Sequence, residues 1–370
     1  MSISIKISFL IKLFFNDILT IKKRRKSMKK NVTFSDIAKY TNFSKTTISR
    51  YFNNPDTLTE DSIRKIEKAL VDLNYTENKV ARSLANGRTE IIGIIIPNLF
   101  LHYYSQVLNN LIDTYSRYNY KFIVFLGNSN PEEEIKYIKE LMAYKIEGLI
   151  MLSHSVDSMT LKELNIPIVS IEREDEFISS VNSDNYGGAV KATDLLIKNN
   201  CDILIHINSN VNKNIPAYKR IKGFKEICEK NNKNYKLYFS DLGNSFDETY
   251  NELYKIYKDI NEKYPHQKKG IFLSNDTHAN IFLNILIKNK KIIPDEYEII
   301  GFDNSPISRE AILPITTVGQ NIEKISDCAM KSLLRQIHFK NNNRSSLLEH
   351  DTIETDLIIR ETTSAVNIDK

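Results

Sequence analysis

The chain has 370 residues, of which 41% are hydrophobic and 26% charged, and these proportions fit an ordinary soluble globular protein of two or three domains. A chain of this length buries enough apolar surface to exclude a need for disulfides or structural metals in its core. Its net charge of +5 is uneven, because residues 1–28 carry +6, residues 29–90 carry +3 and the remainder carries −4. This distribution of charge is typical of a protein whose basic N-terminal domain, the head, binds phosphate groups while the rest of the chain, the body, has another role.

The cysteines and the missing motifs exclude several classes of protein. Cys201, Cys228 and Cys328 stand at neither metal-binding nor redox spacing, so they predict free thiols in a reducing compartment and a cytoplasmic protein. The sequence has no P-loop, no glycine-rich dinucleotide loop after a strand and no zinc-protease motif, and the neighbours Ser153 and His154 lack a nucleophile elbow. We therefore predict that the protein is not an enzyme and uses no cofactor or metal.

Residues 1–28 begin with an apolar run and end with a basic one. Charged and polar residues interrupt the apolar run, which argues against a transmembrane helix, and the order of the two runs argues against a secretory signal. We interpret this segment as a leader that is either disordered or translated from a start upstream of Met28. An amphipathic helix on a membrane surface is the alternative.

Residues 29–75 have the pattern of three short helices. The first helix has an apolar face that includes Phe34 and Ile37, and Ser35 is expected to cap it. Asn42 tolerates the left-handed conformation that a tight turn between helices needs. Ser44 is expected to cap the second helix, and the third helix is predicted to start at Thr59.

The second helix has two different faces. Its apolar positions recur at helical spacing and close a small core: Ile48, Tyr51 and Phe52. The opposite face carries hydrogen-bond donors and no carboxylate: Lys45, Thr46, Ser49 and Arg50. Such a face suits base edges and phosphates in the major groove of DNA. The pattern alone also allows a three-helix interaction module whose basic face is incidental.

The runs VTFSDIAKYTNFSKTTISRYFNN and LNYTENKVARSLANGRT resemble the lac-repressor (LacI/GalR) family of bacterial transcription regulators. The resemblance extends from Met28 to about Thr363, and it departs at residues 41–43, where the family usually shows Ala, Gly and Val. It implies that Lys45, Thr46 and Arg50 occupy the base-reading positions of a helix-turn-helix domain. Ser44, Thr47 and Asn53 are then expected to bind phosphate or to cap helices.

Residues 76–89 resemble the family's hinge. Asn78 can cap a short helix, which is too short to hold in water alone and is expected to fold on DNA. The resemblance implies that Lys79 and Arg82 meet phosphates. It also implies that Leu84 is the apolar wedge in the minor groove, where an ordinary linker residue is the alternative.

Residues 90–363 alternate apolar strands with amphipathic helices, which predicts parallel α/β layering. Two such series indicate two similar parallel-sheet subdomains of the periplasmic-binding-protein type, placed at about 90–183 plus 320–349 and 184–319 plus 350–363. Residues 364–370 form a tail. We read Asp184 and Asn185 as a cap and turn at the crossing between the subdomains, and Gln320 as structural.

Open α/β sheets bind ligands at the carboxyl ends of their strands, and polar residues gather there in this sequence. The resemblance implies that Arg220, Asn275 and Asp303 contact a small-molecule effector. The remaining candidates are aromatic residues at the cleft and two weaker polar positions: Tyr103, Tyr104, Phe246, His102 and Arg173. Two other readings stay open, in which Asp276 only caps a helix and Tyr104 belongs to the core.

These observations predict a cytoplasmic homodimer that represses carbohydrate-utilisation genes from a pseudo-palindromic operator of double-stranded DNA. A sugar or sugar phosphate is expected to control its affinity for DNA. No membrane partner is expected. Three alternatives remain: the sugar-binding protein of a transport system, a sugar-processing enzyme with a regulatory head, and a global carbon regulator with a protein co-effector.

Overall fold

A computed structural model describes residues 32–77, 87–174, 176–209, 215–342, 344 and 347–364, and it divides the chain into two compact units, Met1–Asn86 and Gly87–Lys370. The leader interpreted at residues 1–28 and most of the expected hinge helix lie outside the described residues. Among the described helices, none has both the length and the apolar character needed to cross a bilayer.

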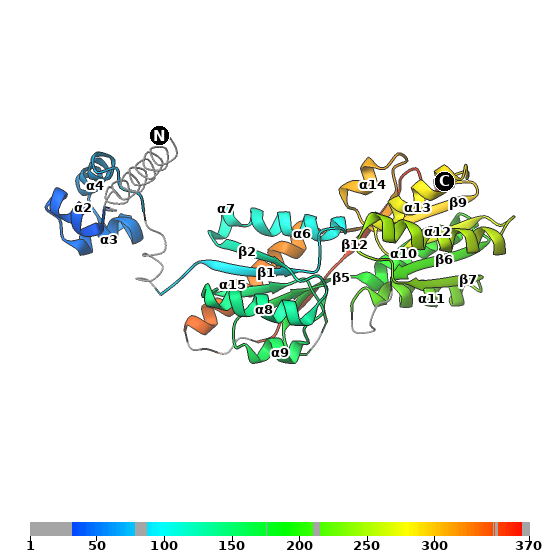
Figure 1. Cartoon of the computed structure of the whole chain (residues 1–370), viewed down its shortest axis with the longest axis horizontal. Coiled ribbons are helices and arrows are strands. Elements are labelled where there is room, and N and C mark those ends of the chain that lie inside the picture. The colour runs from blue at the N-terminus through cyan, green and yellow to red at the C-terminus, as the bar shows by residue number, and fades with distance from the viewer. Residues whose placement is uncertain are drawn as a thin grey trace, which may run out of the picture. The chain divides into compact units, whose positions relative to one another are not determined.

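The described residues of the first unit form a head of three α-helices (Figure 1). Its elements are α2 (Phe34–Thr41), α3 (Lys45–Asn53), a 3-10 turn η1 (Pro55–Thr57) and α4 (Glu60–Asp72). One isoleucine from each helix reaches the centre of the head, and Ile37, Ile48 and Ile66 are fully buried there. The three predicted helices are therefore present, and they surround a core of a few aliphatic and aromatic side chains.

The helix ends follow local side-chain chemistry. The Ser44 Oγ accepts a hydrogen bond from the Thr47 N–H at 3.1 Å, and Asn42 adopts a φ of 58°, so both predictions are confirmed. The predicted cap at Ser35 is wrong. Thr33 is the N-cap, because the Asp36 carboxylate accepts the Thr33 N–H at 2.9 Å and completes a capping box that starts the helix earlier.

The second unit contains two six-stranded sheets. The first has the strand order β11-β5-β4-β3-β1-β2, and every pairing in it is parallel. Its strands are β1 (Ile91–Ile96), β2 (Lys121–Leu126), β3 (Gly148–Met151), β4 (Ile168–Ile171), β5 (Ser179–Ser183) and β11 (His350–Ile353). Its helices are α6 (His102–Asp113), α7 (Tyr115–Tyr118), α8 (Pro131–Ala143), α9 (Ser158–Glu163) and α15 (Ile322–Asn341).

The second sheet has the order β12-β10-β9-β8-β6-β7, and its only antiparallel pair among the described residues joins β10 to β12. Its strands are β6 (Ile203–Ser209), β7 (Tyr235–Ser240), β8 (Lys269–Leu273), β9 (Tyr297–Asp303), β10 (Thr316–Gln320) and β12 (Thr355–Ile358). Its helices are α10 (Asn185–Lys198), α11 (Tyr218–Lys230), α12 (Phe246–Lys263), α13 (Asp276–Lys288) and α14 (Pro306–Glu310).

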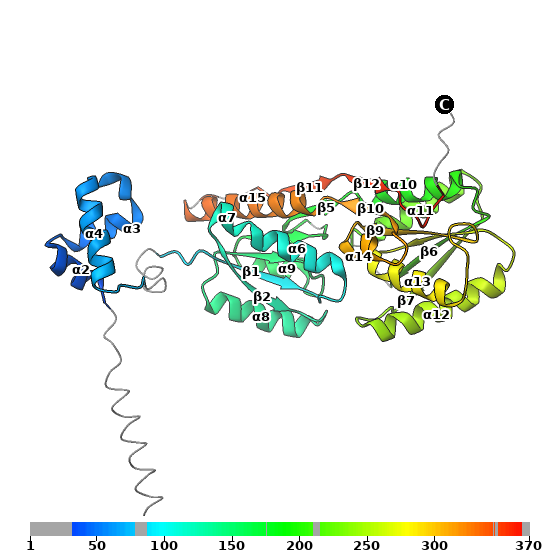
Figure 2. The ribbon, with the colours of Figure 1, turned by 90° about the horizontal axis from the view of Figure 1, so that it is seen from above.

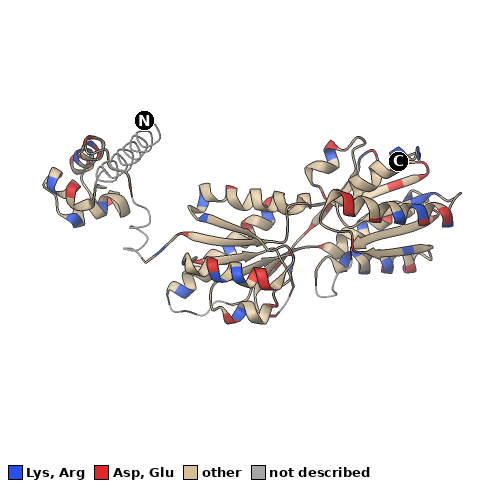
Figure 3. Cartoon of the chain, viewed as in Figure 1, with Lys and Arg blue, Asp and Glu red and all other residues tan. Residues whose placement is uncertain are grey.

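Helices cover both faces of each sheet (Figure 2). In the first subdomain α6 and α15 pack on one face, while α8 and α9 pack on the other. In the second, α12 and α13 lie opposite α10 and α11. A parallel strand covered on both faces needs apolar side chains in both directions, which explains the five isoleucines in Ile91–Ile96 of β1. Charged residues accordingly lie mostly on the helices (Figure 3).

The chain crosses between the subdomains three times, from β5 to α10, from β10 to α15 and from β11 to β12. The expected boundary at residues 349 and 350 needs correction, because His350–Ile353 pair in parallel with β5 of the first sheet. The Asp184 N–H also donates to the Ile353 carbonyl at 2.8 Å. The last crossing therefore lies at Glu354, within an extended segment that serves both sheets. The cap at Asp184 is confirmed by its bond from the Gly187 N–H at 2.8 Å.

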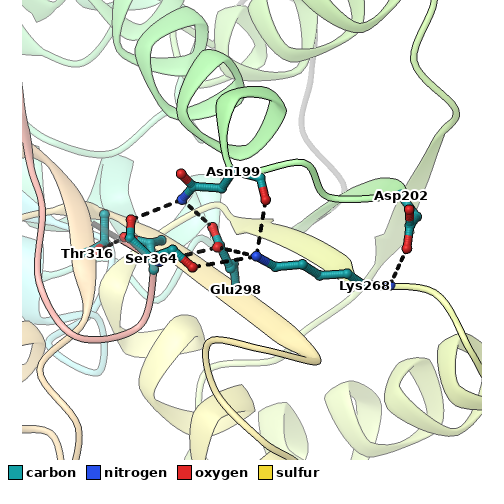
Figure 4. Close-up of polar contacts among 7 residues, drawn as sticks. Asn199, Asp202, Lys268, Glu298, Thr316 and Ser364 are labelled. Carbon is teal, nitrogen blue, oxygen red and sulfur yellow. Dashed lines mark hydrogen bonds and ion pairs between the residues drawn. The ribbon is translucent and has the colours of Figure 1, made fainter. Parts of the chain in front are cut away.

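A largely buried ion pair and its neighbours join Ser364, the last residue described, to the second sheet (Figure 4). The Lys268 Nζ lies 2.8 Å from the Glu298 Oε1, and the Glu298 side chain is fully buried. The Asn199 Nδ2 donates to the other oxygen of this carboxylate at 2.7 Å and to the Ser364 carbonyl at 3.1 Å. Asn199, the C-cap of α10, therefore satisfies a carboxylate oxygen that has no access to water.

The Asn199→Ala substitution is expected to lower the free energy of unfolding by about 1.5–3 kcal/mol, because it removes a hydrogen bond to a buried charge. Urea unfolding of the whole chain measures the loss. The matched control is Asn231→Ala at the C-cap of α11, where Asn231 bonds only the Ile227 carbonyl at an exposed site. Equal losses in the two variants would contradict the role assigned to Asn199.

Candidate functional sites

The outer face of α3 carries the predicted DNA-binding residues. Lys45, Thr46, Arg50 and Asn53 are exposed, while Thr47 and Ser49 are half-buried. The helix has no acidic residue, and its buried side is anchored by Ile48. The structure thus separates a core face from a face of donors, as the sequence predicts. Such a face can offer hydrogen bonds to base edges and phosphates.

Four of the predicted DNA-binding side chains also make contacts within the head. Ser44 caps α3, and its hydroxyl lies 2.9 Å from the Thr47 Oγ1. Further along the helix, the Asn53 Nδ2 donates to the Ser49 Oγ at 3.2 Å. The hinge candidates Asn78, Lys79, Arg82 and Leu84 lie outside the described residues.

The second unit contains a cavity of about 390 Å³ at the carboxyl ends of strands from both sheets. Its wall includes Asp303 at the end of β9, Ser274 just after β8, Asn208 near the end of β6 and Glu172 just after β4. Side chains from helices complete the wall, among them Tyr103, Tyr104 and Arg220. This is the position that open parallel sheets offer to a ligand.

Five of the eight predicted effector residues share this wall, namely Tyr103, Tyr104, Arg220, Asn275 and Asp303. The two tyrosine rings meet edge to face at 5.5 Å between centroids. Tyr104 both lines the cavity and packs against the core of the first subdomain, so the core reading and the site reading hold together. Burial, the largest cause, raises the pKa of both phenols, which keeps them neutral donors.

Arg220 is held rigidly in the wall. Its Nε donates to the Asn185 Oδ1 at 2.6 Å, and its Nη1 donates to the Ser274 carbonyl. The guanidinium carbon lies 3.6 Å from the centroid of the Phe302 ring, which gives the cation a flat aromatic support. A guanidinium fixed in this way presents its charge to the cavity in one orientation, which suits directional hydrogen bonding.

Asp303 ends β9 with a φ of 114°, a conformation that costs of order 1–3 kcal/mol and persists only where the surroundings impose it. The Gln320 Nε2 donates to its Oδ1 at 2.7 Å. Burial raises the pKa of Asp303 well above the ordinary range, although Arg220 acts in the opposite direction. Gln320 also accepts a hydrogen bond from the Ser183 hydroxyl, so it connects this carboxyl to the first crossing.

Glu172 is a site residue that the sequence reasoning missed. It is buried in the cavity wall, its Oε1 accepts the Ser183 N–H at 2.6 Å, and its Oε2 accepts the Asn185 Nδ2 at 2.8 Å. Because Asn185 also accepts from Arg220, one network joins the wall to the first crossing. Glu172 follows the apolar run of β4 directly. The rule that polar residues at the carboxyl ends of strands bind ligands, the strand-end rule, selected Asp303 and could also have found Glu172.

Two buried polar atoms in the cavity wall have no partner within the described structure, the Tyr103 hydroxyl and the His154 Nδ1. Burial lowers the pKa of His154 to about 4, so its ring is neutral at physiological pH. A buried polar group left unbonded is costly. These atoms are therefore suited to a ligand that supplies the missing hydrogen bonds.

Three predicted effector residues lie outside the cavity wall as described. The His102 ring bonds the Thr277 hydroxyl at 3.1 Å, which joins α6 of the first subdomain to α13 of the second. Arg173 is buried and donates to the Ser153 carbonyl at 3.5 Å. Phe246 is 49% exposed at the start of α12, where its ring stacks on Tyr250.

The alternative reading of Asp276 as a helix cap is wrong. Asn275 is the N-cap of α13, because its Oδ1 accepts the His278 N–H at 2.8 Å. Asp276 is instead fully buried, and its carboxyl accepts from the Thr317 hydroxyl at 2.6 Å and the Ser305 N–H at 2.7 Å. Burial raises its pKa to about 7. Asp276 therefore joins α13 to the segment that follows β9.

Known proteins share this whole arrangement. Residues 33–78 match the profile of bacterial regulatory proteins of the lacI family. Residues 89–249 match the periplasmic binding proteins and sugar binding domain of the LacI family, and residues 193–363 match a periplasmic binding protein-like domain. The sucrose operon repressor of Streptococcus mutans is 30% identical over 318 residues, which cover 85% of this chain and 95% of the repressor. The ribose operon repressor of Halalkalibacterium halodurans is 29% identical over 90% of this chain and 97% of its own.

Solved structures agree on the fold. The lac repressor dimer bound to operator and the anti-inducer ONPF superposes with a TM-score of 0.77 at 19% identity, over 91% of this chain and all of that chain. A LacI family regulator from Enterococcus faecium with bound ribose gives 0.64 at 22% identity, over 74% of this chain and 98% of its own. The chain therefore belongs to the lacI family of bacterial regulatory proteins and is a DNA-binding transcriptional regulator.

Proposed function

We propose that this regulator represses carbohydrate-utilisation genes and that a sugar or sugar phosphate bound in the cavity controls its affinity for DNA. The carrying observation is the composition of the cavity wall, where Arg220, Asp303 and Asn275 converge beside two tyrosine rings. Hydroxyl groups of a sugar need such paired donors and acceptors, and the apolar face of a sugar ring packs on aromatic rings. The sucrose and ribose operon repressors among its relatives support this ligand class.

The DNA side of the proposal assigns direct base reading to Lys45, Thr46 and Arg50 on α3. Ser44, Thr47, Ser49 and Asn53 support them through phosphate contacts or caps, and the hinge candidates bind the minor groove. We propose that the chain acts as a cytoplasmic homodimer on a pseudo-palindromic operator, since two-fold protein symmetry matches two-fold DNA symmetry. The lac repressor dimer on its operator supports this arrangement.

Control requires only that the effector has different affinities for two states of the body. The cavity wall supports such coupling, because its Glu172 accepts the Ser183 N–H, and its Asp303 is bonded by Gln320, which also accepts from the Ser183 hydroxyl. A ligand that forms hydrogen bonds with these side chains changes the contacts of the segments that join the subdomains. The role we propose is regulatory throughout, and a turnover assay with the bound sugar tests it against a catalytic one.

A paired experiment tests the proposal. Operator fragments are first selected from genomic DNA with the full chain, and the chain is then screened by thermal shift against D-ribose, sucrose, D-fructose and their phosphates. A ligand that binds only the folded state raises the melting temperature, by an amount that corresponds to about 2.7 kcal/mol at a hundredfold excess over Kd. The expected result is that the stabilising sugar also changes operator affinity. A sugar that stabilises the protein without any change in operator binding would contradict the proposal.

A further inference from the structure

A buried histidine lies behind the cavity wall of the second subdomain. His206 in β6 is fully buried, and its ring packs against Phe224 and Phe272, with centroids 5.3 and 4.7 Å away. Asn208, two residues later on the same face of the strand, is also buried and lines the cavity. The two side chains are in contact, with the Asn208 Nδ2 3.3 Å from the His206 Nε2.

The contacts of His206 determine which of its nitrogens carries the proton. Its Nδ1 lies 2.9 Å from the Phe272 main-chain carbonyl, which can only accept a hydrogen bond. The Nδ1 is therefore the donor. Burial lowers the pKa of His206 to about 3, and Arg220 acts in the same direction, so the ring is neutral and its Nε2 can only accept. The group of Asn208 that faces the Nε2 must be its NH2, which leaves the carboxamide oxygen on the other side.

We propose that His206 is a positioning residue that holds the Asn208 carboxamide with its oxygen toward the effector. This inference rests on the sugar-binding role proposed above and makes it more specific. At Asn208 the wall accepts a hydrogen bond, so it selects a hydroxyl group and disfavours a phosphate or carboxylate oxygen, which cannot donate.

Another asparagine of the wall, Asn275, presents N–H donors where Asn208 presents an acceptor. The Oδ1 of Asn275 is engaged with the His278 N–H at the start of α13, and its Nδ2 lies 3.0 Å from the His278 Nδ1. The Asn275 Nδ2 also lies 3.5 Å from the Ser274 Oγ, so the amide oxygen is engaged at the helix start and the amide presents N–H donors. Asn208 and Asn275 thus each contact a buried histidine, and one presents an acceptor while the other presents a donor, which matches the dual character of sugar hydroxyl groups.

The orientation is tested first without any ligand. In the full chain labelled with 15N-histidine, a long-range proton–nitrogen spectrum reports the tautomer of each ring, and the His206→Gln variant assigns the signal. The expected result is a neutral His206 ring protonated at Nδ1 at both pH 7 and pH 5. A ring protonated at Nε2, or a cationic ring at pH 5, overturns the proposal.

Binding is tested with D-ribose and D-ribose 5-phosphate as probes in calorimetric titrations. His206→Leu removes the acceptor and is expected to weaken ribose binding roughly tenfold, the effect of losing about one hydrogen bond. His206→Gln returns a carbonyl oxygen to Asn208 and is expected to recover most of that loss. Wild-type affinity in His206→Leu, no recovery in His206→Gln, or tighter binding of the phosphate overturns the proposal.

If neither probe binds, the tautomer spectrum alone decides the role of His206. Melting curves and operator binding report whether each variant folds. Operator binding without sugar depends on the head and tests the regulatory function separately. A failure of that function is therefore distinguishable from a failure of the positioning role.

Discussion

The Arg50→Ala variant is expected to bind its operator only as well as it binds unrelated DNA. Arg50 is exposed on the donor face of α3, and a guanidinium that contacts two acceptors of guanine contributes about 1–3 kcal/mol of discrimination. A dimer uses the residue twice, so roughly twice that discrimination is lost. Weak binding that falls steeply with salt is expected to remain, because phosphate contacts carry no sequence information. Fluorescence titrations with operator and scrambled duplexes over a salt series measure both quantities.

The matched control for Arg50 is Arg64→Ala on α4 of the same head. Arg64 is also exposed, but its guanidinium pairs with Glu60 at 3.1 Å, four residues earlier on the helix. Exposed pairs of this kind contribute little to stability, so the control variant is expected to keep its operator preference. If Arg50→Ala keeps its preference as well, α3 is not the reading helix.

The head could be predicted in detail because its signals are local. Ser44, Asn42 and Thr59 act on backbone groups within three residues of themselves, and the structure has all three in the expected roles. The one error, at Ser35, has the same local origin. Ser35 and Thr33 are both good caps, and only the reach of the Asp36 carboxylate back to the Thr33 N–H favours the earlier one.

The cavity was only partly predictable because its wall depends on long-range packing. The strand-end rule correctly placed Asp303 and Asn275 in the wall, and it also applies to Glu172 and Asn208, which the sequence reasoning passed over. Phe246 lies outside the cavity wall for another reason. An aromatic residue at the start of a helix can turn toward a cavity or along the helix, and here it stacks on Tyr250. No sequence pattern distinguishes these outcomes.

The last crossing between the subdomains shows a similar limit. The segment from His350 to Ile358 contains no glycine or proline, and it pairs with β5 over its first part and with β10 over its second. A strand that changes sheets without a turn leaves no local signal at the point of change. The boundary therefore becomes visible only when both partners are known.

The Asp303→Ala variant is expected to bind operator as the wild-type chain does and to remain bound when the effector is added. The substitution lies in the body, whereas the reading residues belong to the separate head. A buried neutral carboxyl that is hydrogen-bonded to sugar hydroxyls contributes about 0.5–1.5 kcal/mol per bond, so the loss of one or two such bonds weakens effector binding roughly tenfold. Without that differential affinity, the effector cannot shift the balance between the two states. Operator release at increasing sugar concentration measures the effect.

The melting temperature distinguishes a variant that has lost the ligand contact from one that has lost the fold. Burial raises the pKa of Asp303, so the native state favours the protonated carboxyl, and stability falls as the pH rises through that raised pKa. Removing the carboxyl is therefore not expected to lower the melting temperature at neutral pH. Asp303→Asn keeps an acceptor for the Gln320 Nε2, and Asp356→Ala changes an exposed acid of the same sheet. Asp303 faces the cavity and Asp356 does not. Release of operator by sugar is therefore expected to fail in both Asp303 variants and to persist in Asp356→Ala. Ready release from Asp303→Ala would show that the effector binds elsewhere.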